Sequence, residues 1–336
     1  MKKIACFFAV AACVACSYDV CEVSGEDQAG KSSGGISVTL EFESELTKAS
    51  GDYLESLSVE DRINRVDVLV FDKQTGDLNA SKAVTGVDDP CEFSVTTGEK
   101  VIYAVANAPD LSNILNVSQL EQVVNDLSTT DYRNDGFMMV GSSGCQVRLG
   151  EVAEPVINLK RMVARVVIKK MKNKFASQFG SITVDCMFLA NANMVQTLGG
   201  VSSQPVNVGG YADASKTMPI GKNGVTGECP LYMFRQLGIV IPEGATKSDV
   251  NYMYCHPTND EAKTCVYILL TVAGNKYYYR VPLLDGLQSN KTYTIELEFL
   301  NRGPALPPDG DLQKGDIKAV VTVSGWDAGK SYSVIF

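Results

Sequence analysis

Alternation of apolar and polar residues, with a period of two, recurs along most of this 336-residue chain. In "ISVTLEFE" the apolar residues Ile36, Val38, Leu40 and Phe42 share one face, and serine, threonine and glutamate occupy the other. This alternation predicts a half-buried β-strand. Because no regular alternation of strands with helices is present, Rossmann and TIM-barrel folds are excluded and an all-β fold is predicted. Further strands are predicted within 63–80, 91–110, 181–192, 231–241, 264–283, 290–300 and 317–336.

One short helix is predicted in "NVSQLEQVVNDL", where Asn116 or Ser118 provides a cap. Its apolar residues recur at helical spacing: Leu120, Val123, Val124 and Leu127. The chain is too long for one ordinary sandwich, so two tandem antiparallel β-sandwiches are predicted. The β-branched run "PVINLKRMVARVVIKKM" is interpreted as their junction, with an N-terminal domain at 36–160 and a C-terminal domain at 161–336.

The N-terminus has the pattern of an export signal. Two lysines precede the short apolar run "IACFFAVAACVA", which is typical of a secretory leader. Small residues precede both Cys13 and Cys16, as in the lipobox of bacterial lipoproteins. We predict a signal peptide at 1–15, a lipid on Cys16 and a Gly/Ser-rich tether at 16–35. Cys13 is the alternative lipid site, and a plain secretory signal is the alternative leader.

The composition offers little for catalysis or for cofactors. The net charge of −9 gives no electrostatic support for a nucleic-acid partner. The only histidine, His256, lies in the loop-like "MYCHPTND" and is predicted to be a surface residue. No C-x-x-C pair follows the leader, so neither zinc nor another cofactor is expected. We therefore predict no enzymatic activity. Export permits a disulfide between two of the four cysteines Cys186, Cys229, Cys255 and Cys265, and the sequence does not say which two would pair.

The segment after the first predicted strand has neither a helical nor a strand period. It reads "SELTKASGDYLESLSVEDR", is long and polar, and offers no packing face. Proteolytic nicking concentrates in segments of this kind. The basic residues available to a trypsin-like protease are Lys48, followed by Ala49, and Arg62 farther along.

The order of these signals resembles the fimbrillin family, the subunits of type V fimbriae of Gram-negative anaerobes. The resemblance rests on the leader, the early strand, "INRVDVLVFD", "GEKVIYAVANAP", "LKRMVARVVIKK", "NKTYTIELEFLNRGP" and "VTVSGWDAGKSYSVIF", in this order. It implies two transthyretin-like sandwich domains in a lipoprotein carried to the outer membrane through its lipid. It also implies that a trypsin-like protease removes the N-terminal segment together with its first strand.

Carried onto this sequence, the resemblance implies that the strand of Ile36, Val38, Leu40 and Phe42 is displaced. Cleavage falls after Lys48, before Ala49, where fimbrillins more often have arginine; Arg62 is the alternative. The vacated place accepts a strand of another copy or of another fimbrial subunit. The predicted donor is the alternating C-terminal strand, and the alternative is that this strand completes its own sandwich. The donor residues are Ala319, Val321, Val323, Trp326, Tyr332, Val334 and Phe336.

We therefore predict a structural subunit of a surface fimbria that supports adhesion. The precursor is expected at the outer membrane and the mature subunit in the fimbria. Two alternatives remain: an anchor or tip subunit of the same fimbria, and a surface lipoprotein that binds glycan or peptide without polymerising.

Overall fold

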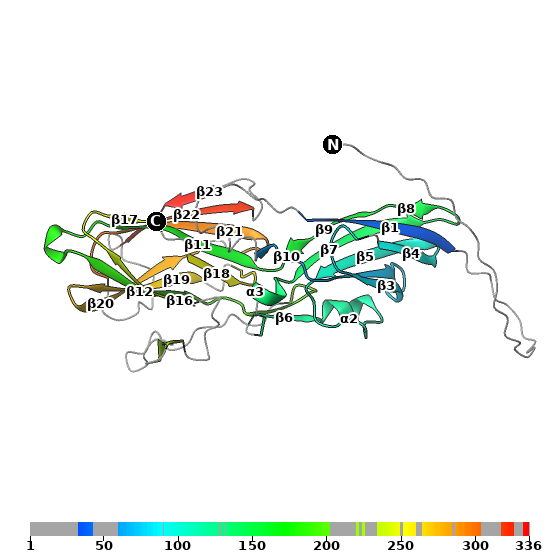
Figure 1. Ribbon diagram of the computed structural model, residues 1–336, viewed down its shortest axis with the longest axis horizontal. Helices are drawn as coiled ribbons and strands as arrows, with labels where there is room; N and C mark the ends of the chain where they lie inside the picture. Colours follow the sequence, from blue (N-terminus) through cyan, green and yellow to red (C-terminus); the bar gives the residue numbers. More distant parts are fainter. Residues whose placement is uncertain are drawn as a thin grey trace, which may run out of the picture.

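The structure, a computed structural model, is nearly all β, as predicted. It shows two β-sandwiches lying end to end along the long axis of the molecule (Figure 1). In the part of the chain that it describes, no helix is long and apolar enough to cross a membrane. The described residues are 33–42, 60–89, 91–127, 129–130, 132–201, 220–221, 224–225, 234–248, 251–259, 264–283, 286–303, 317–325 and 332–335.

The N-terminal sandwich consists of two facing sheets, in the strand orders β4-β1-β8, with β9 also on β1, and β10-β7-β5-β2-β3. Apolar residues from the inner faces of both sheets form one core, with Ile36 of β1, Val68 of β2 and Ile102 of β5 among its members. The strands are β1 (Ser33–Glu41), β2 (Val66–Asp72), β3 (Leu78–Val84), β4 (Cys91–Thr96), β5 (Gly98–Ala106), β7 (Met139–Val147), β8 (Val152–Ala153), β9 (Val156–Asn158) and β10 (Lys160–Arg161).

The C-terminal sandwich faces a sheet of order β17-β11-β21-β22-β23, with β18 also on β11, against a sheet of order β16-β12-β19-β20. Its core is the larger of the two and includes Val166, Leu270 and Phe299. The strands are β11 (Ala164–Asn173), β12 (Ile182–Ala190), β16 (Phe234–Ile241), β17 (Thr246–Lys247), β18 (Asn251–Cys255), β19 (Cys265–Val272), β20 (Asn275–Pro282), β21 (Lys291–Phe299), β22 (Ile317–Gly325) and β23 (Tyr332–Ile335). A 3-10 turn, η1 (Ser177–Phe179), and the small hairpin of β14 (Ile220–Gly221) and β15 (Gly224–Val225) lie outside these sheets.

The predicted helix is shorter than its sequence pattern indicated. Helix α2 covers Val117–Glu121, and Asn116 caps it by accepting a hydrogen bond from the Gln119 amide at 2.9 Å. A second short helix, α3, covers Tyr132–Asp135. The apolar residues after Glu121 do not extend α2, because Val124–Asp126 forms strand β6.

Strand β6 pairs antiparallel with β13 (Val195–Thr197), a strand that follows β12. A two-stranded sheet therefore joins the two sandwiches, with one strand from each half of the chain. The Leu127 amide donates to the Met194 carbonyl at 3.0 Å and extends this pairing. Ladder hydrogen bonds to a distant segment outweigh the helical period of the local sequence.

His256 is completely buried at this junction, so the prediction of a surface histidine is wrong. Its Nδ1 lies 3.3 Å from the Met162 carbonyl oxygen, and its Nε2 lies 3.1 Å from the Asn125 carbonyl oxygen. Burial lowers the pKa of His256 to about 4. The loop-like sequence around His256 concealed its role, because both partners are carbonyls from distant parts of the chain.

We expect this histidine to make folding sensitive to acid. In the unfolded chain the ring titrates near its ordinary pKa of about 6.5, whereas in the folded chain it stays neutral down to about pH 4. Stability is thus present above pH 6.5 and lost as the pH falls through 4, by up to about 3 kcal/mol. Urea unfolding of the wild type and of His256→Asn at pH 7.5 and 4.5 measures this loss. An equal loss in both proteins would contradict the prediction.

Candidate functional site

Strand β1 lies between other strands on both of its edges (Figure 1). It pairs antiparallel with β4, from Ser33 opposite Thr96 to Val38 opposite Cys91. On its other edge it pairs parallel with β8 and β9. We call the place that β1 occupies between β4 and β8–β9 the β1 slot. Without β1, the slot would expose two unpaired strand edges.

The inner face of β1 fills part of the N-terminal core. The side chains of Ile36, Val38 and Leu40 are 1, 6 and 6% exposed, and Phe42 is half-buried. Burial of three such side chains stabilises the fold by roughly 5–9 kcal/mol. The strand is thus a substantial part of the folded domain, although it precedes every other described element in sequence.

One end of the β1 slot has room only for glycine. A Cβ atom built on Gly34 would lie 2.4 Å from the Arg148 carbonyl oxygen and 2.7 Å from Val147 Cγ1. The first contact is with backbone, which cannot rotate away. Next to it, the Gly35 amide donates to the Glu151 carbonyl at 2.9 Å. A strand in this slot therefore needs a glycine, or no residue, at the register of Gly34.

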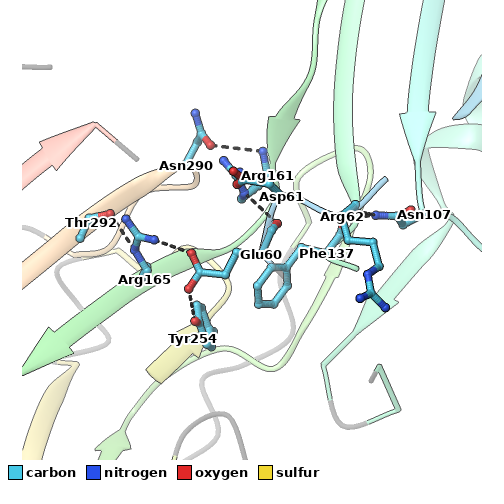
Figure 2. Close-up of polar contacts among 10 residues, drawn as sticks. All are labelled: Glu60, Asp61, Arg62, Asn107, Phe137, Arg161, Arg165, Tyr254, Asn290 and Thr292. Carbon is cyan, nitrogen blue, oxygen red and sulfur yellow. Dashed lines mark hydrogen bonds and ion pairs between the residues drawn. The ribbon is translucent and has the colours of Figure 1, made fainter. Parts of the chain in front are cut away.

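Glu60, which follows the 43–59 segment, lies in a buried polar cluster between the two sandwiches (Figure 2). Glu60 itself is completely buried. One carboxylate oxygen accepts a hydrogen bond from Arg165 Nη1, and the other accepts one from the Tyr254 hydroxyl. Arg165 also donates from Nε to the Thr292 hydroxyl at 3.1 Å. The first described residue after the 43–59 segment is thus held by the C-terminal domain.

Arg161 adds the second half of this cluster (Figure 2). Its side chain is 1% exposed and forms an ion pair with Asp61. Its Nε donates to the Glu60 carbonyl at 3.3 Å. We call Glu60, Asp61, Arg161, Arg165 and Tyr254 the junction clamp. Burial raises the pKa of Glu60, and the charges of Arg165 and Arg161 and the hydrogen bond from Tyr254 act in the opposite direction.

Arg161 also reaches the end of β1. Its guanidinium carbon lies 4.8 Å from the centre of the Phe42 ring, within the range of a cation–π contact. The two described ends of the 43–59 segment, Phe42 and Glu60, therefore meet at one side chain. The contact with Phe42 depends on β1, whereas the contacts with Glu60 and Asp61 do not.

The backbone after the clamp is held by the N-terminal domain. The Asn107 side chain donates to the carbonyls of Arg62, at 2.8 Å, and Phe137, at 2.9 Å, and it accepts from the Asn64 amide at 2.9 Å (Figure 2). A Cβ on Gly136 would lie 2.4 Å from the Arg62 carbonyl oxygen, so glycine permits this close approach. The Arg62 side chain is exposed, but its peptide is fixed.

The sequence-predicted site residues are distributed as follows. Cys13, Cys16, Lys48, Ala49, Trp326 and Phe336 lie outside the described residues. Ala319 and Val321 of β22 are buried in the C-terminal core, and Val323 is partly buried against it. Tyr332 and Val334 lie in β23, the edge strand that pairs with β22.

Sequence reasoning missed the roles of Glu60, Arg161, Arg165 and Asn107. Three of them lie in the stretches "KRMVAR" and "VANAP", two of the pieces that carry the resemblance stated above. Glu60 carries no such signal. Cys91, Cys145, Cys255 and Cys265 form no disulfide. Among the described residues no group of three or more histidine, cysteine or carboxylate side chains is placed to hold a metal ion.

Part of the chain that contains these features is similar to a known family. Residues 36–143 match the model of the major fimbrial subunit protein family, FimA. The match contains β1, β2 and the segment between them, together with Asn107. No curated protein sequence matches the chain.

Several solved structures share the fold. A fimbrilin (FimA) from Porphyromonas gingivalis matches 88% of this chain and 98% of its own, with a TM-score of 0.61 and 15% identity. The tip fimbrial protein Mfa3 from the same organism, truncated at its C-terminus, matches 88% and 100%, with a TM-score of 0.53 and 18% identity. A protein from Bacteroides eggerthii, proposed to act in cell adhesion, matches 90% and 98%, with a TM-score of 0.63 and 16% identity. At these identities the comparisons establish the fold, and the predicted resemblance to fimbrillins is confirmed.

Proposed function

We propose that this chain, whose residues 36–143 match the model of the FimA family of major fimbrial subunits, is a subunit of a cell-surface fimbria that polymerises by strand exchange. In this proposal a protease cuts the 43–59 segment, β1 leaves, and a strand of a neighbouring subunit fills the β1 slot. The mature subunits assemble with one another and with other subunits of the fimbria, and the polymer supports adhesion.

The observation that carries the proposal is the construction of the β1 slot. A strand that fills a core is normally continuous with its domain, yet β1 is separated from Glu60 by the polar 43–59 segment. The junction clamp then holds the chain from Glu60 onward through contacts that do not include β1. Cutting between Phe42 and Glu60 would therefore break the covalent link that holds β1 to the domain, so that β1 can leave while the rest of the molecule stays anchored.

The energetics favour exchange over simple loss. Loss of β1 without a replacement would remove roughly 5–9 kcal/mol of stabilisation by apolar burial and would leave two strand edges unpaired. A strand of similar pattern from another subunit would restore both contributions, as in other cases of β-strand addition. The proposal thus gives a physical reason for a stable polymer.

The test is the maturation of the full chain on the cell surface. N-terminal sequencing of the mature form should find a start between residues 44 and 60, and unboiled samples should form a ladder in SDS gels. A mature form that still begins before residue 33, together with a single monomer band, would contradict strand exchange.

We also propose that the precursor is anchored in the outer membrane by lipid on Cys16. One acyl chain binds a membrane weakly, whereas several chains anchor firmly. Cys16→Ala should therefore abolish lipid labelling and release the chain from the membrane fraction. Cys13→Ala is the matched control and should change neither. Lipid labelling that survives in Cys16→Ala and disappears in Cys13→Ala would assign the anchor to Cys13 instead.

A further inference from the structure

Lysines are concentrated on the outer face of one C-terminal sheet, although the whole chain has a net charge of −9. Strands β11, β21 and β22 lie side by side in this sheet (Figure 1). Four lysines and two glutamates of these strands and of the position after β11 form what we call the basic face: Lys170, Lys172, Lys174, Glu296, Glu298 and Lys318. All of them except Lys174 line a depression of about 270 Å³. The basic face is thus a hollowed patch with a local excess of positive charge.

Strand register fixes the order of the charges across the basic face. Lys172 of β11 lies opposite Glu298 of β21, and Glu298 lies opposite Lys318 of β22. On its other side Lys172 lies opposite Thr246 of β17. Because neighbouring strands are about 4.8 Å apart, the backbones of the two lysines are about 10 Å apart, with the glutamate midway between them. The row therefore reads hydroxyl, cation, carboxylate, cation.

Glu298 alone does not neutralise the lysines around it. Its Oε2 forms an ion pair with Lys174 at 2.9 Å. The hydrogen bond from Lys174 is the main reason why the pKa of Glu298 lies below its ordinary value, and the charges of Lys174, Lys318 and Lys172 lower it further. Lys172 and Lys318 form no ion pair with any of the described residues. Their ammonium groups can therefore pair with an anion from outside the chain.

We propose that the basic face binds a linear polysaccharide that has a carboxylate on every second sugar. Two carboxylates of the polysaccharide pair with Lys172 and Lys318, whose separation is comparable with the length of one disaccharide. Hydroxyls of the sugar between them donate to Glu298, because a carboxylate has about four acceptor sites and Lys174 occupies only part of them. This inference rests on the proposed function for its setting, adhesion at the cell surface, and adds the chemical class of the ligand.

The two glutamates favour such a polysaccharide over a denser polyanion. DNA carries one negative charge for about every 1.7 Å of its axis, so its phosphates would also lie against Glu296 and Glu298. Like charges at such short range repel each other. A polymer with widely spaced carboxylates meets the lysines and places its hydroxyls at the glutamates. Repulsion from the rest of the acidic chain is screened beyond about 8 Å at physiological ionic strength.

The remaining lining of the depression suits a sugar ring. Leu297 and Val320 line it together with the charged side chains and Thr246. Lysine side chains also have apolar stems that cover the surface below their ammonium groups. A sugar ring has hydroxyls at its rim and C–H groups on its faces, so it can contact both kinds of surface. The depression therefore offers apolar contact as well as charge.

The test is binding of hyaluronan to the full chain before maturation, measured by titration calorimetry. Hyaluronan has one carboxylate per disaccharide, and dextran serves as the neutral polysaccharide. The wild type should bind hyaluronan and not dextran. Replacing Lys172 and Lys318 together with glutamine should lower the affinity for hyaluronan about tenfold, which corresponds to the loss of two exposed ion pairs. Replacing both with arginine keeps the charges and should preserve binding.

A matched control removes the same charge from other places on the surface. Lys82 in β3 and Lys276 in β20 are exposed and lie outside the basic face. The double variant Lys82→Gln, Lys276→Gln should bind hyaluronan as the wild type does. Unchanged unfolding temperatures of both glutamine variants would show that any loss of affinity arises at the binding surface. An equal loss of affinity in the two variants would overturn the assignment to the basic face.

The other outcomes separate this inference from the proposed function. Hyaluronan bound no better than dextran would overturn the polysaccharide site, even if the matured wild type forms an SDS-resistant ladder. Double-stranded DNA bound as tightly as hyaluronan would show a surface that accepts any polyanion and would also overturn the inference. A wild type that binds hyaluronan but forms no ladder after maturation would overturn strand exchange and leave the polysaccharide site standing.

Discussion

Replacing Glu60 with alanine is expected to lower the free energy of unfolding by about 3–5 kcal/mol. The substitution removes the carboxylate that accepts hydrogen bonds from Arg165 and Tyr254 at a completely buried position. Arg165, a residue that is 6% exposed, would then lose this carboxylate partner. An unpaired buried charge destabilises a fold far more than an exposed one, which water solvates.

The measurement is urea unfolding of the wild type and of Glu60→Ala, with Glu99→Ala as the matched control. Glu99 forms an ion pair with Lys73 at 3.1 Å, but both side chains are more than half exposed. Loss of an exposed pair typically costs less than 1 kcal/mol. Similar losses in the two variants would contradict a stabilising role for the junction clamp.

Replacing Lys48 with alanine is expected to block maturation and leave full-length precursor on the membrane. Lys48 is the basic residue of the 43–59 segment, and a trypsin-like protease cuts after basic residues. The alternative site differs in its surroundings. The carbonyl of the Arg62 peptide accepts a hydrogen bond from Asn107, and Gly136 packs against it. A peptide held on the folded domain resists entry into a protease site.

Arg62→Ala is therefore the matched control and should mature normally. Gel mobility of the surface form and N-terminal sequencing give the result for both variants. Normal fimbriae from Lys48→Ala together with a block in Arg62→Ala would reverse the assignment. Normal fimbriae from the double variant would show that maturation requires cleavage at neither Lys48 nor Arg62.

The junction clamp also bears on the state of the subunit after cleavage. The contacts of Glu60 and Asp61 join the remaining N-terminus to Arg165 and Arg161, and these belong to the rest of the molecule. Of the contacts of Arg161 described above, the one with the Phe42 ring would leave with β1. We expect a mature subunit to keep its two sandwiches joined, because β6 and β13 also pair across the junction.

The sequence by itself determined the features that depend on neighbours in the chain. The period-two alternation predicted the all-β fold and the inward face of β1, and Asn116, one of two predicted caps, caps the helix in the structure. These follow from local geometry, because side chains alternate along a strand and a cap acts within one helical turn.

Only the tertiary structure decided the junction. The residues after Glu121 have a helical period but form strand β6, because they pair through ladder hydrogen bonds with β13, about 70 residues later. His256 was predicted at the surface and is buried against carbonyls from two distant segments. Glu60 and Arg165 are separated by 105 residues, and nothing near either one indicates that they meet. The physical reason is that a buried charge needs a partner in space, and a single sequence does not show which distant residue the fold brings to it.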